Sequence, residues 1–124
     1  MVHMLGQAVA AYTDATHGHT LSAVSGAYYR LLIGRSEEAV KKFRRLAENV
    51  WGISSDGKTE KDIAVEGLLR MEEWMRDMGL AMNITACGAD ASQLEGMADA
   101  CPINESGYVV LTREDVIEVL RQSL

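Results

Sequence analysis

The near-absence of β-strand patterns restricts the possible folds of this chain more than any other feature of its sequence. Alternation of β-branched or aromatic residues with polar ones is confined to Tyr108–Leu111. The only proline is Pro102, so long stretches remain in which apolar residues recur at helical spacing. We therefore expect residues 1–124 to form a single all-α domain, which is long enough to bury a core without disulfides or a structural metal.

The first part of the sequence predicts two apolar helices. The first is expected over Val2–Tyr12 and is apolar on nearly all sides, as in a helix buried within a larger body. The polar run Thr13–Thr16 interrupts it. A second helix is expected from Gly18 or His19 to Ile33, with Gly34 in the left-handed conformation that often ends a helix.

The remaining helices are predicted from capping signals and apolar spacing. Ser36 precedes two glutamates and an amphipathic stretch that ends before Gly52. Thr59 and Asp62 form a capping box, and the helix that follows is expected to reach Gly79. Its expected buried face consists of Ala64, Leu68, Met71, Met75 and Met78. A short helix is expected over Ala91–Ala100, after a connection at Asn83–Asp90, and a last one from Thr112 through Leu120.

Charge and hydropathy narrow the classes of function. The formal net charge is −6 and the isoelectric point is about 5.0, which argues against a nucleic-acid partner because phosphates would be repelled. Apolar runs are too short to span a membrane and the first residues lack the basic start of a signal peptide, so we expect a cytoplasmic protein. The two cysteines, Cys87 and Cys101, lack the spacing of a zinc site and are expected to be small, semi-buried thiols.

All three histidines, His3, His17 and His19, lie in the first nineteen residues. Imidazole is a common ligand of iron, zinc and nickel, and a turn between two helices could bring His3 and His17 together. Their spacing is not a short helical interval, so the sequence also allows a histidine at a frayed terminus and one that bonds the backbone near a helix start. His19 is expected to be a surface or capping residue.

The segment from His3 to Gly18 resembles the signature of iron-containing alcohol dehydrogenases, in which a histidine, a helix and a His-Gly pair follow at this separation. Further similarity to the butanol dehydrogenase branch lies in three other segments, Leu21–Arg30, Ala47–Ile53 and Gly107–Val116. The resemblance covers essentially the whole chain. It implies the all-α bundle of the C-terminal domain in these enzymes and in dehydroquinate synthase-like proteins.

The resemblance also implies a chemistry. In this family one aspartate and three histidines hold a divalent metal, which binds the alcohol oxygen while a hydride passes to or from NAD(P). By motif position, His3 and His17 would be two of the metal ligands. Iron is the expected metal, with zinc or nickel as alternatives. The substrate of the parent enzyme would be a small alcohol or aldehyde.

Two departures from the family pattern bear on activity. Most members carry a second site-lining histidine four residues after the first, where this chain has Gln7, whose amide cannot shuttle a proton near neutral pH. The α/β domain that binds the nucleotide, and the stretch with the other two metal ligands, have no counterpart in the 124 residues. We therefore assign no catalytic residue and no cofactor-binding residue to this chain. We expect it to be a C-terminal domain or fragment that is inactive alone.

Two other hypotheses remain open. The chain could be a stand-alone helical module that keeps a reduced metal site of His3 and His17, completed by Gln7, His19 or a second copy of the chain. It could also be a metal-free interaction module that associates with itself through the first helix. Under the fragment hypothesis and the interaction-module hypothesis alike, we expect Met4, Leu5 and Val9 to be exposed at an edge of the domain. The first helix would then lose the free energy of burying these side chains and be the least stable helix of the domain.

Overall fold

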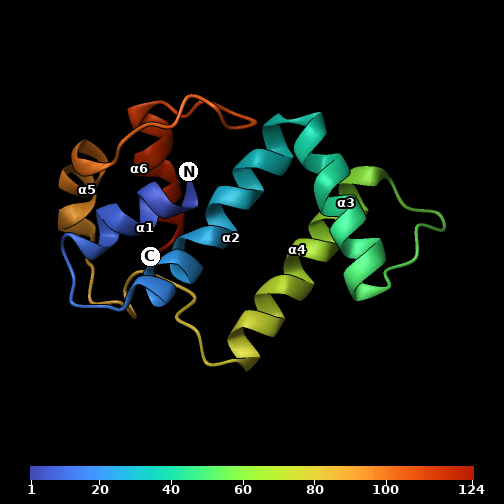
Figure 1. Ribbon diagram of the computed structural model, residues 1–124, viewed down its shortest axis with the longest axis horizontal. Coiled ribbons are helices and arrows are strands. Elements are labelled where there is room, and N and C mark those ends of the chain that lie inside the picture. Colours follow the sequence, from blue (N-terminus) through green and yellow to red (C-terminus); the bar gives the residue numbers. More distant parts are fainter.

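Helices provide all the regular structure of the protein, as a computed structural model that describes residues 1–124 shows (Figure 1). In chain order the elements are α1 (Val2–Ala10), α2 (His17–Arg35), α3 (Glu37–Trp51), α4 (Glu60–Asp77), the 3-10 helix η1 (Ala91–Gln93), α5 (Leu94–Ala100) and α6 (Arg113–Gln122). The prediction of an all-α fold is confirmed. Tyr108–Leu111 forms no strand and belongs to the loop between α5 and α6.

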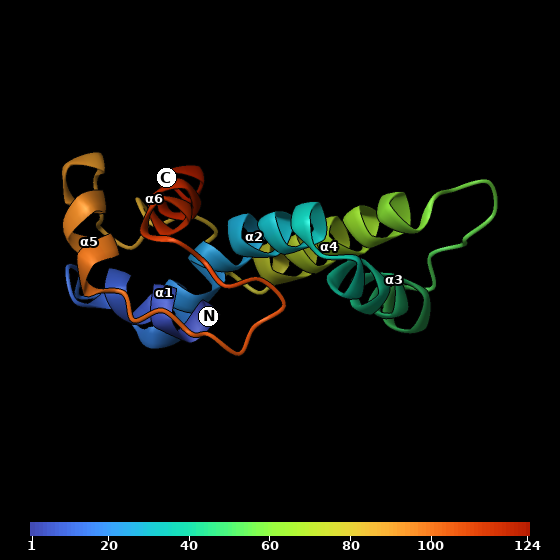
Figure 2. The ribbon, with the colours of Figure 1, turned by 90° about the horizontal axis from the view of Figure 1, so that it is seen from above.

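The longest helix, α2, is the common partner of two groups of helices. On one side α1 and α6 pack against α2, and α5 joins them; on the other side α4 packs against α2 and carries α3. Figures 1 and 2 show these two groups at opposite ends of the molecule. No helix of the chain has the length and apolar character needed to cross a membrane.

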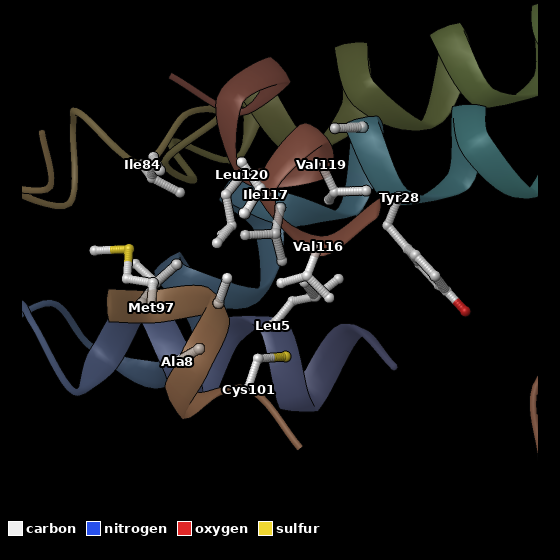
Figure 3. Close-up of a cluster of buried hydrophobic side chains, with 14 of the residues drawn as sticks. Leu5, Ala8, Tyr28, Ile84, Met97, Cys101, Val116, Ile117, Val119 and Leu120 are labelled. Atoms are coloured by element: carbon white, nitrogen blue, oxygen red, sulfur yellow. The ribbon is translucent and has the colours of Figure 1, made fainter. Parts of the chain in front are cut away.

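The main core lies in the group formed by α1, α2, α5 and α6. Leu5 of α1 faces Val116 and Leu120 of α6, and Met97 of α5 closes the same cluster (Figure 3). Ile84, from the long connection before η1, is also fully buried there. Burying a large aliphatic side chain contributes roughly 1.5–3 kcal/mol, so this cluster is the main source of stability for the helices that carry the histidines.

The prediction that the first helix is exposed at a domain edge is wrong. Leu5 and Val9 are 0% exposed and Met4 is half-buried, because α5 and α6 of the same chain cover the apolar face of α1. These covering helices lie about 90 residues or more further along the sequence, so local patterns gave no sign of them. Self-association is therefore not needed to bury this helix.

Several helix ends follow the predicted capping residues. Ser36 accepts a hydrogen bond from the amide of Ala39, and Thr59 and Asp62 form the expected capping box. Thr112 and Asp115 form a further box at the start of α6. Gly52 and Gly79 have φ angles of 65° and 77°, which glycine adopts without strain.

Two predicted helix ends are wrong. The first helix stops at Ala10 rather than Tyr12, because residues 11 and 12 form a turn. The second helix continues through Gly34 to Arg35, and Gly34 has no positive φ. The chain leaves the helix at Ser36, whose extended backbone starts α3, so the cap of the next helix determines where α2 ends.

In α4, the buried side chains are not the predicted row of methionines. Of those three residues only Met75 is buried; Met71 is half-buried and Met78 is 58% exposed at the C-cap. Ala64 and Leu68 are buried as predicted, and the buried face also includes Ile63 and, unexpectedly, Glu72. The Glu72 carboxylate accepts a hydrogen bond of 2.6 Å from Arg30, which joins α4 to α2.

Close packing of α3 on α4 yields a stability prediction. A Cβ atom added at Gly67 would lie 2.6 Å from Cβ of Ala47, whereas nothing lies within 4 Å of one added at the helical Gly34. We expect Gly67→Ala to lower the free energy of unfolding by about 1–3 kcal/mol through overpacking. Gly34→Ala should raise it by up to about 1 kcal/mol through helix propensity. Urea unfolding followed by circular dichroism measures both, and a stabilised Gly67→Ala variant would contradict the close packing.

Candidate functional site

The structure brings two of the three histidines together. His3 lies in the first turn of α1 and His17 is the first residue of α2. Their ring centroids are 5.1 Å apart and the ring planes are inclined by 59°. Both residues are exposed, and neither imidazole forms a hydrogen bond within the chain. The nitrogen atoms of both rings are therefore available to a ligand.

The close approach of α1 to α2 sets this separation. A Cβ atom added at Gly6 would lie 2.7 Å from Cδ2 of Leu21 and 3.3 Å from Oγ1 of Thr20, so any larger residue would displace the Leu21 side chain or push the two helices apart. Gly6 is one turn after His3, and Thr20 is one turn after His17. Each histidine thus lies one turn before the point where the helices touch.

The geometry of the pair suits a shared metal ion. With metal–nitrogen bonds of about 2.0–2.1 Å, two imidazoles on one tetrahedral ion would place their centroids roughly 5 Å apart. The chain has no cluster of three or more histidine, cysteine or acidic side chains arranged to hold a metal. His3 and His17 could therefore supply two ligands and leave the remaining positions to water, substrate or donors of another chain or domain.

Gln7 lies on the same exposed side of α1 as His3. It follows His3 by one helical turn, so both side chains project from one face of the helix. An amide at this position can donate or accept a hydrogen bond but carries no proton that titrates near neutral pH. The residue can help to orient a ligand near the pair, and it cannot serve as a general acid or base.

His19 has a different role from the one expected of a surface or capping residue. Its Nδ1 atom accepts a hydrogen bond of 2.9 Å from the backbone amide of Ala81, and Ser22 donates one of 2.7 Å to the carbonyl of Ala81. These two bonds fasten the segment after α4 to the first turns of α2. His19 is half-buried, and the hydrogen bond from the Ala81 amide occupies its Nδ1 atom.

A pocket adjoins the histidine pair. It has a volume of about 550 Å³ and lies between the start of α1, the middle of α2 and the loop before α6. The pocket is lined by Met1, Val2, His3, Tyr28, Tyr29, Leu32, Ser106, Gly107 and Tyr108. The amide of Asn104 donates a hydrogen bond to Sδ of Met1, which places this loop over the start of α1.

Local sequence patterns missed the pocket residues. The sequence places Tyr28 and Tyr29 within a predicted apolar helix, with no sign that they line a pocket. No local pattern indicated that the loop around Tyr108 packs near them. The family resemblance included the segment that begins at Gly107, but it did not predict that this segment lies beside His3.

The thiols take no part in the candidate site. Cys87 and Cys101 are free, as predicted, and they are more deeply buried than the sequence led us to expect. Burial raises the pKa of both thiols, and that of Cys101 to about 11, so neither forms much thiolate at neutral pH. Since the thiolate is the form that binds metals and attacks electrophiles, both residues are structural.

Comparison with known proteins identifies the family of this chain. The sequence matches the model of the family described as "Fe-containing alcohol dehydrogenase family, C-terminal" over residues 1–124. The chain belongs to this family. Its fold is accordingly that of the family's C-terminal domain.

Curated relatives are similar over nearly the whole chain. A protein of Bacillus subtilis named "Probable NADH-dependent butanol dehydrogenase 2" is 28% identical over 127 residues, which include 98% of this chain and 32% of the relative. NADH-dependent butanol dehydrogenase B of Clostridium acetobutylicum is 28% identical over 98 residues. That match includes 78% of this chain and 24% of the relative. The chain thus spans about a third or less of the length of these proteins.

Solved structures of this family show the same fold. NADH-dependent butanol dehydrogenase A of Thermotoga maritima superposes with a TM-score of 0.80 at 22% identity, over 98% of this chain and 32% of the other. A 1,3-propanediol oxidoreductase gives a TM-score of 0.85 at 17% identity, over 99% of this chain and 32% of the other. At these identities the likeness establishes the fold.

The different surroundings of the histidines predict different effects on stability. His3→Ala and His17→Ala remove exposed rings without hydrogen bonds and should change the free energy of unfolding by about 0.5 kcal/mol or less. His19→Ala leaves the Ala81 amide without its partner and should cost about 1–3 kcal/mol. Urea unfolding of the metal-free variants tests this order. A larger loss from His17→Ala than from His19→Ala would contradict the assignment of roles.

Proposed function

We propose that this chain is the metal-liganding domain of an NAD(P)-dependent alcohol dehydrogenase, which oxidises small alcohols or reduces the corresponding aldehydes. The observation that carries the proposal is the pair of free imidazoles of His3 and His17, held with their ring centroids 5.1 Å apart by two packed helices. Membership of the Fe-containing alcohol dehydrogenase family supports the same chemistry. The two relatives named above are NADH-dependent butanol dehydrogenases, which favours NADH as the nicotinamide cofactor.

The proposal assigns a separate role to each residue of the site. His3 and His17 hold a divalent ion through one nitrogen each, and iron, zinc and nickel all accept imidazole. The bound ion supplies Lewis acidity for an alcohol or carbonyl oxygen. Gln7 offers an amide for a hydrogen bond to the substrate or to water, and the adjoining pocket offers apolar side chains to the carbon chain of the substrate.

We propose that the other parts of the active site come from outside these 124 residues. The chain spans about a third of the length of its relatives, and it lacks a cluster of three metal-ligating side chains. A nucleotide-binding domain would supply the nicotinamide site and the remaining ligands. In its absence the chain should show no turnover of 1-butanol with NAD⁺ or NADP⁺, and measurable turnover would contradict this part of the proposal.

Metal binding by the isolated chain tests the central step. Titration of the tag-free, metal-free protein with Zn²⁺ or Co²⁺ in a calorimeter should give about one ion per chain. His3→Ala and His17→Ala should each weaken binding by at least about tenfold, since each removes one of two protein ligands.

His19→Asn is the matched control for this titration. Asparagine keeps an acceptor close to the position of Nδ1, so the contact with Ala81 is retained while the imidazole is removed. Its affinity for Zn²⁺ should equal that of the unchanged protein within about twofold. Equal affinity of the His3→Ala, His17→Ala double variant and the unchanged protein would overturn the metal site.

A further inference from the structure

The first turn of α2, which carries His17, has no cap of its own. The Thr16 side chain at the N-cap forms no capping hydrogen bond, and no acidic residue lies in the first turn. Helices α3, α4 and α6 each begin with a side-chain cap and have two acidic residues in the first turn. The second residue of α2 is Gly18, which has a low helix propensity. A helix start of this kind frays unless other contacts hold it.

A single residue of another segment holds this turn. The Ala81 amide donates a hydrogen bond of 2.9 Å to Nδ1 of His19, and the Ser22 hydroxyl donates one of 2.7 Å to the Ala81 carbonyl. Figure 1 shows the chain after α4 passing beside the first turns of α2. Both backbone polar groups of Ala81 are therefore bonded to α2. We call these two hydrogen bonds the Ala81 clamp.

The Ala81 clamp is rigid because the chain is fixed on both sides of it. Just before Ala81, the amide of Leu80 donates a hydrogen bond of 3.1 Å to the carbonyl of Met75 in α4. After it, Ile84 is 0% exposed, and its amide donates a hydrogen bond of 2.7 Å to the carbonyl of Ser123 beyond α6. The first turn of α2 is thus tied to the ends of two other helices.

The backbone of His17 is part of the turn that the clamp holds. His19 follows it by two residues, and the carbonyl of His17 accepts a hydrogen bond of 3.0 Å from the hydroxyl of Thr20. Thr20 is 0% exposed and lies at the contact of the two helices beside Gly6. If the turn frayed, the imidazole of His17 would leave its place 5.1 Å from the ring of His3.

We propose that His19 is a positioning residue for the candidate metal site. Through the Ala81 clamp it keeps the first turn of α2 helical, so that His17 stays within reach of an ion shared with His3. The affinity for the ion then depends on the fraction of molecules in which this turn is formed. The inference rests on the proposed function, because it concerns the affinity of that site.

Zn²⁺ titration of the tag-free, metal-free chain in a calorimeter tests the role of His19. His19→Ala should weaken Zn²⁺ binding by about three- to tenfold, because the first turn of α2 is then formed only part of the time. Ser22→Ala removes the other hydrogen bond of the clamp and should weaken binding in the same direction. His19→Asn should restore the affinity to within about twofold, because its amide oxygen can accept the bond from Ala81.

The rescue by asparagine separates positioning from ligation. If His19 bound the ion through Nε2, the loss of imidazole in His19→Asn would weaken binding as much as His19→Ala does, because an amide oxygen is a poorer zinc ligand than imidazole. Failure of the rescue would therefore overturn the inference.

Gly67→Ala is the matched control for a general loss of stability. It overpacks the contact of α3 with α4 and is expected to destabilise the chain by a similar amount to His19→Ala. Urea unfolding shows that each variant folds and ranks their stabilities. Gly67→Ala should leave the Zn²⁺ affinity within about twofold, because it is remote from α1 and the clamp. Equal losses of affinity in the two variants would contradict positioning.

Amide hydrogen exchange of the metal-free chain reports the turn itself. His19→Ala should speed exchange at residues 20–22, whose amides lie at the start of α2, and Gly67→Ala should not. Unchanged exchange at these residues in His19→Ala would contradict the clamp.

Two further backgrounds show through which ligand His19 acts. In the His3→Ala background the remaining ligand is His17, so His19→Ala should weaken Zn²⁺ binding further. In the His17→Ala background the remaining ligand lies on α1, so His19→Ala should change the affinity by less than about twofold. The same effect in both backgrounds, or an unchanged affinity in His19→Ala alone, would overturn the inference.

The inference and the proposed function fail in distinguishable ways. Zn²⁺ affinity that does not depend on His3 or His17 would overturn the metal site, and the inference would fall with it. Affinity that depends on both histidines but not on His19→Ala would overturn the inference alone and leave the metal site in place.

Discussion

The contact between α1 and α2 at Gly6 is the constraint on which the candidate site depends. A side chain at this position would meet Leu21 and Thr20, so the absence of one lets the two helix backbones approach closely. His3 and His17 each lie one turn before the contact, and their ring centroids are consequently 5.1 Å apart. A metal site would need ligands on rigid elements, and two packed helices hold both histidines.

The rest of the core keeps these two helices in place. On one side of α1, helices α5 and α6 bury Leu5 and Val9 completely, so α1 cannot shift without opening the main cluster. At the start of α2, His19 and Ser22 bind the backbone of Ala81 and fix the first turns, next to His17. The helix pair α3 and α4 packs against α2 through other contacts, such as Arg30 with Glu72, away from the histidines.

Sequence patterns predicted the features that depend on neighbouring residues. The caps at Ser36, Thr59 and Thr112 and the helix ends near Gly52 and Gly79 are determined by residues within one helical turn, and the sequence located them. Gly34 was misassigned because glycine also occurs inside helices, and the decisive signal was the cap of the next helix at Ser36. The family signature, not the spacing itself, singled out His3 and His17.

Contacts between distant parts of the chain could not be predicted in this way. The partner of His19 is 62 residues away, and the helices that cover α1 come at the end of the sequence. The pocket beside His3 forms only when the loop that contains Ser106, Gly107 and Tyr108 packs near Tyr28, so its residues share no local pattern. Glu72 occupies a position on the buried face of α4 where helical periodicity predicts an apolar residue.

X-ray absorption spectroscopy of the zinc-loaded chain tests the central claim most directly, because it reports the ligands of the ion itself. If α1 and α2 hold His3 and His17 in position to share one ion, the spectrum should contain two imidazole ligands per zinc with Zn–N distances of about 2.0–2.1 Å. Water or buffer should complete the coordination, and the His17→Ala variant should retain only one imidazole. A spectrum with no imidazole or a single one in the unchanged protein would contradict the account.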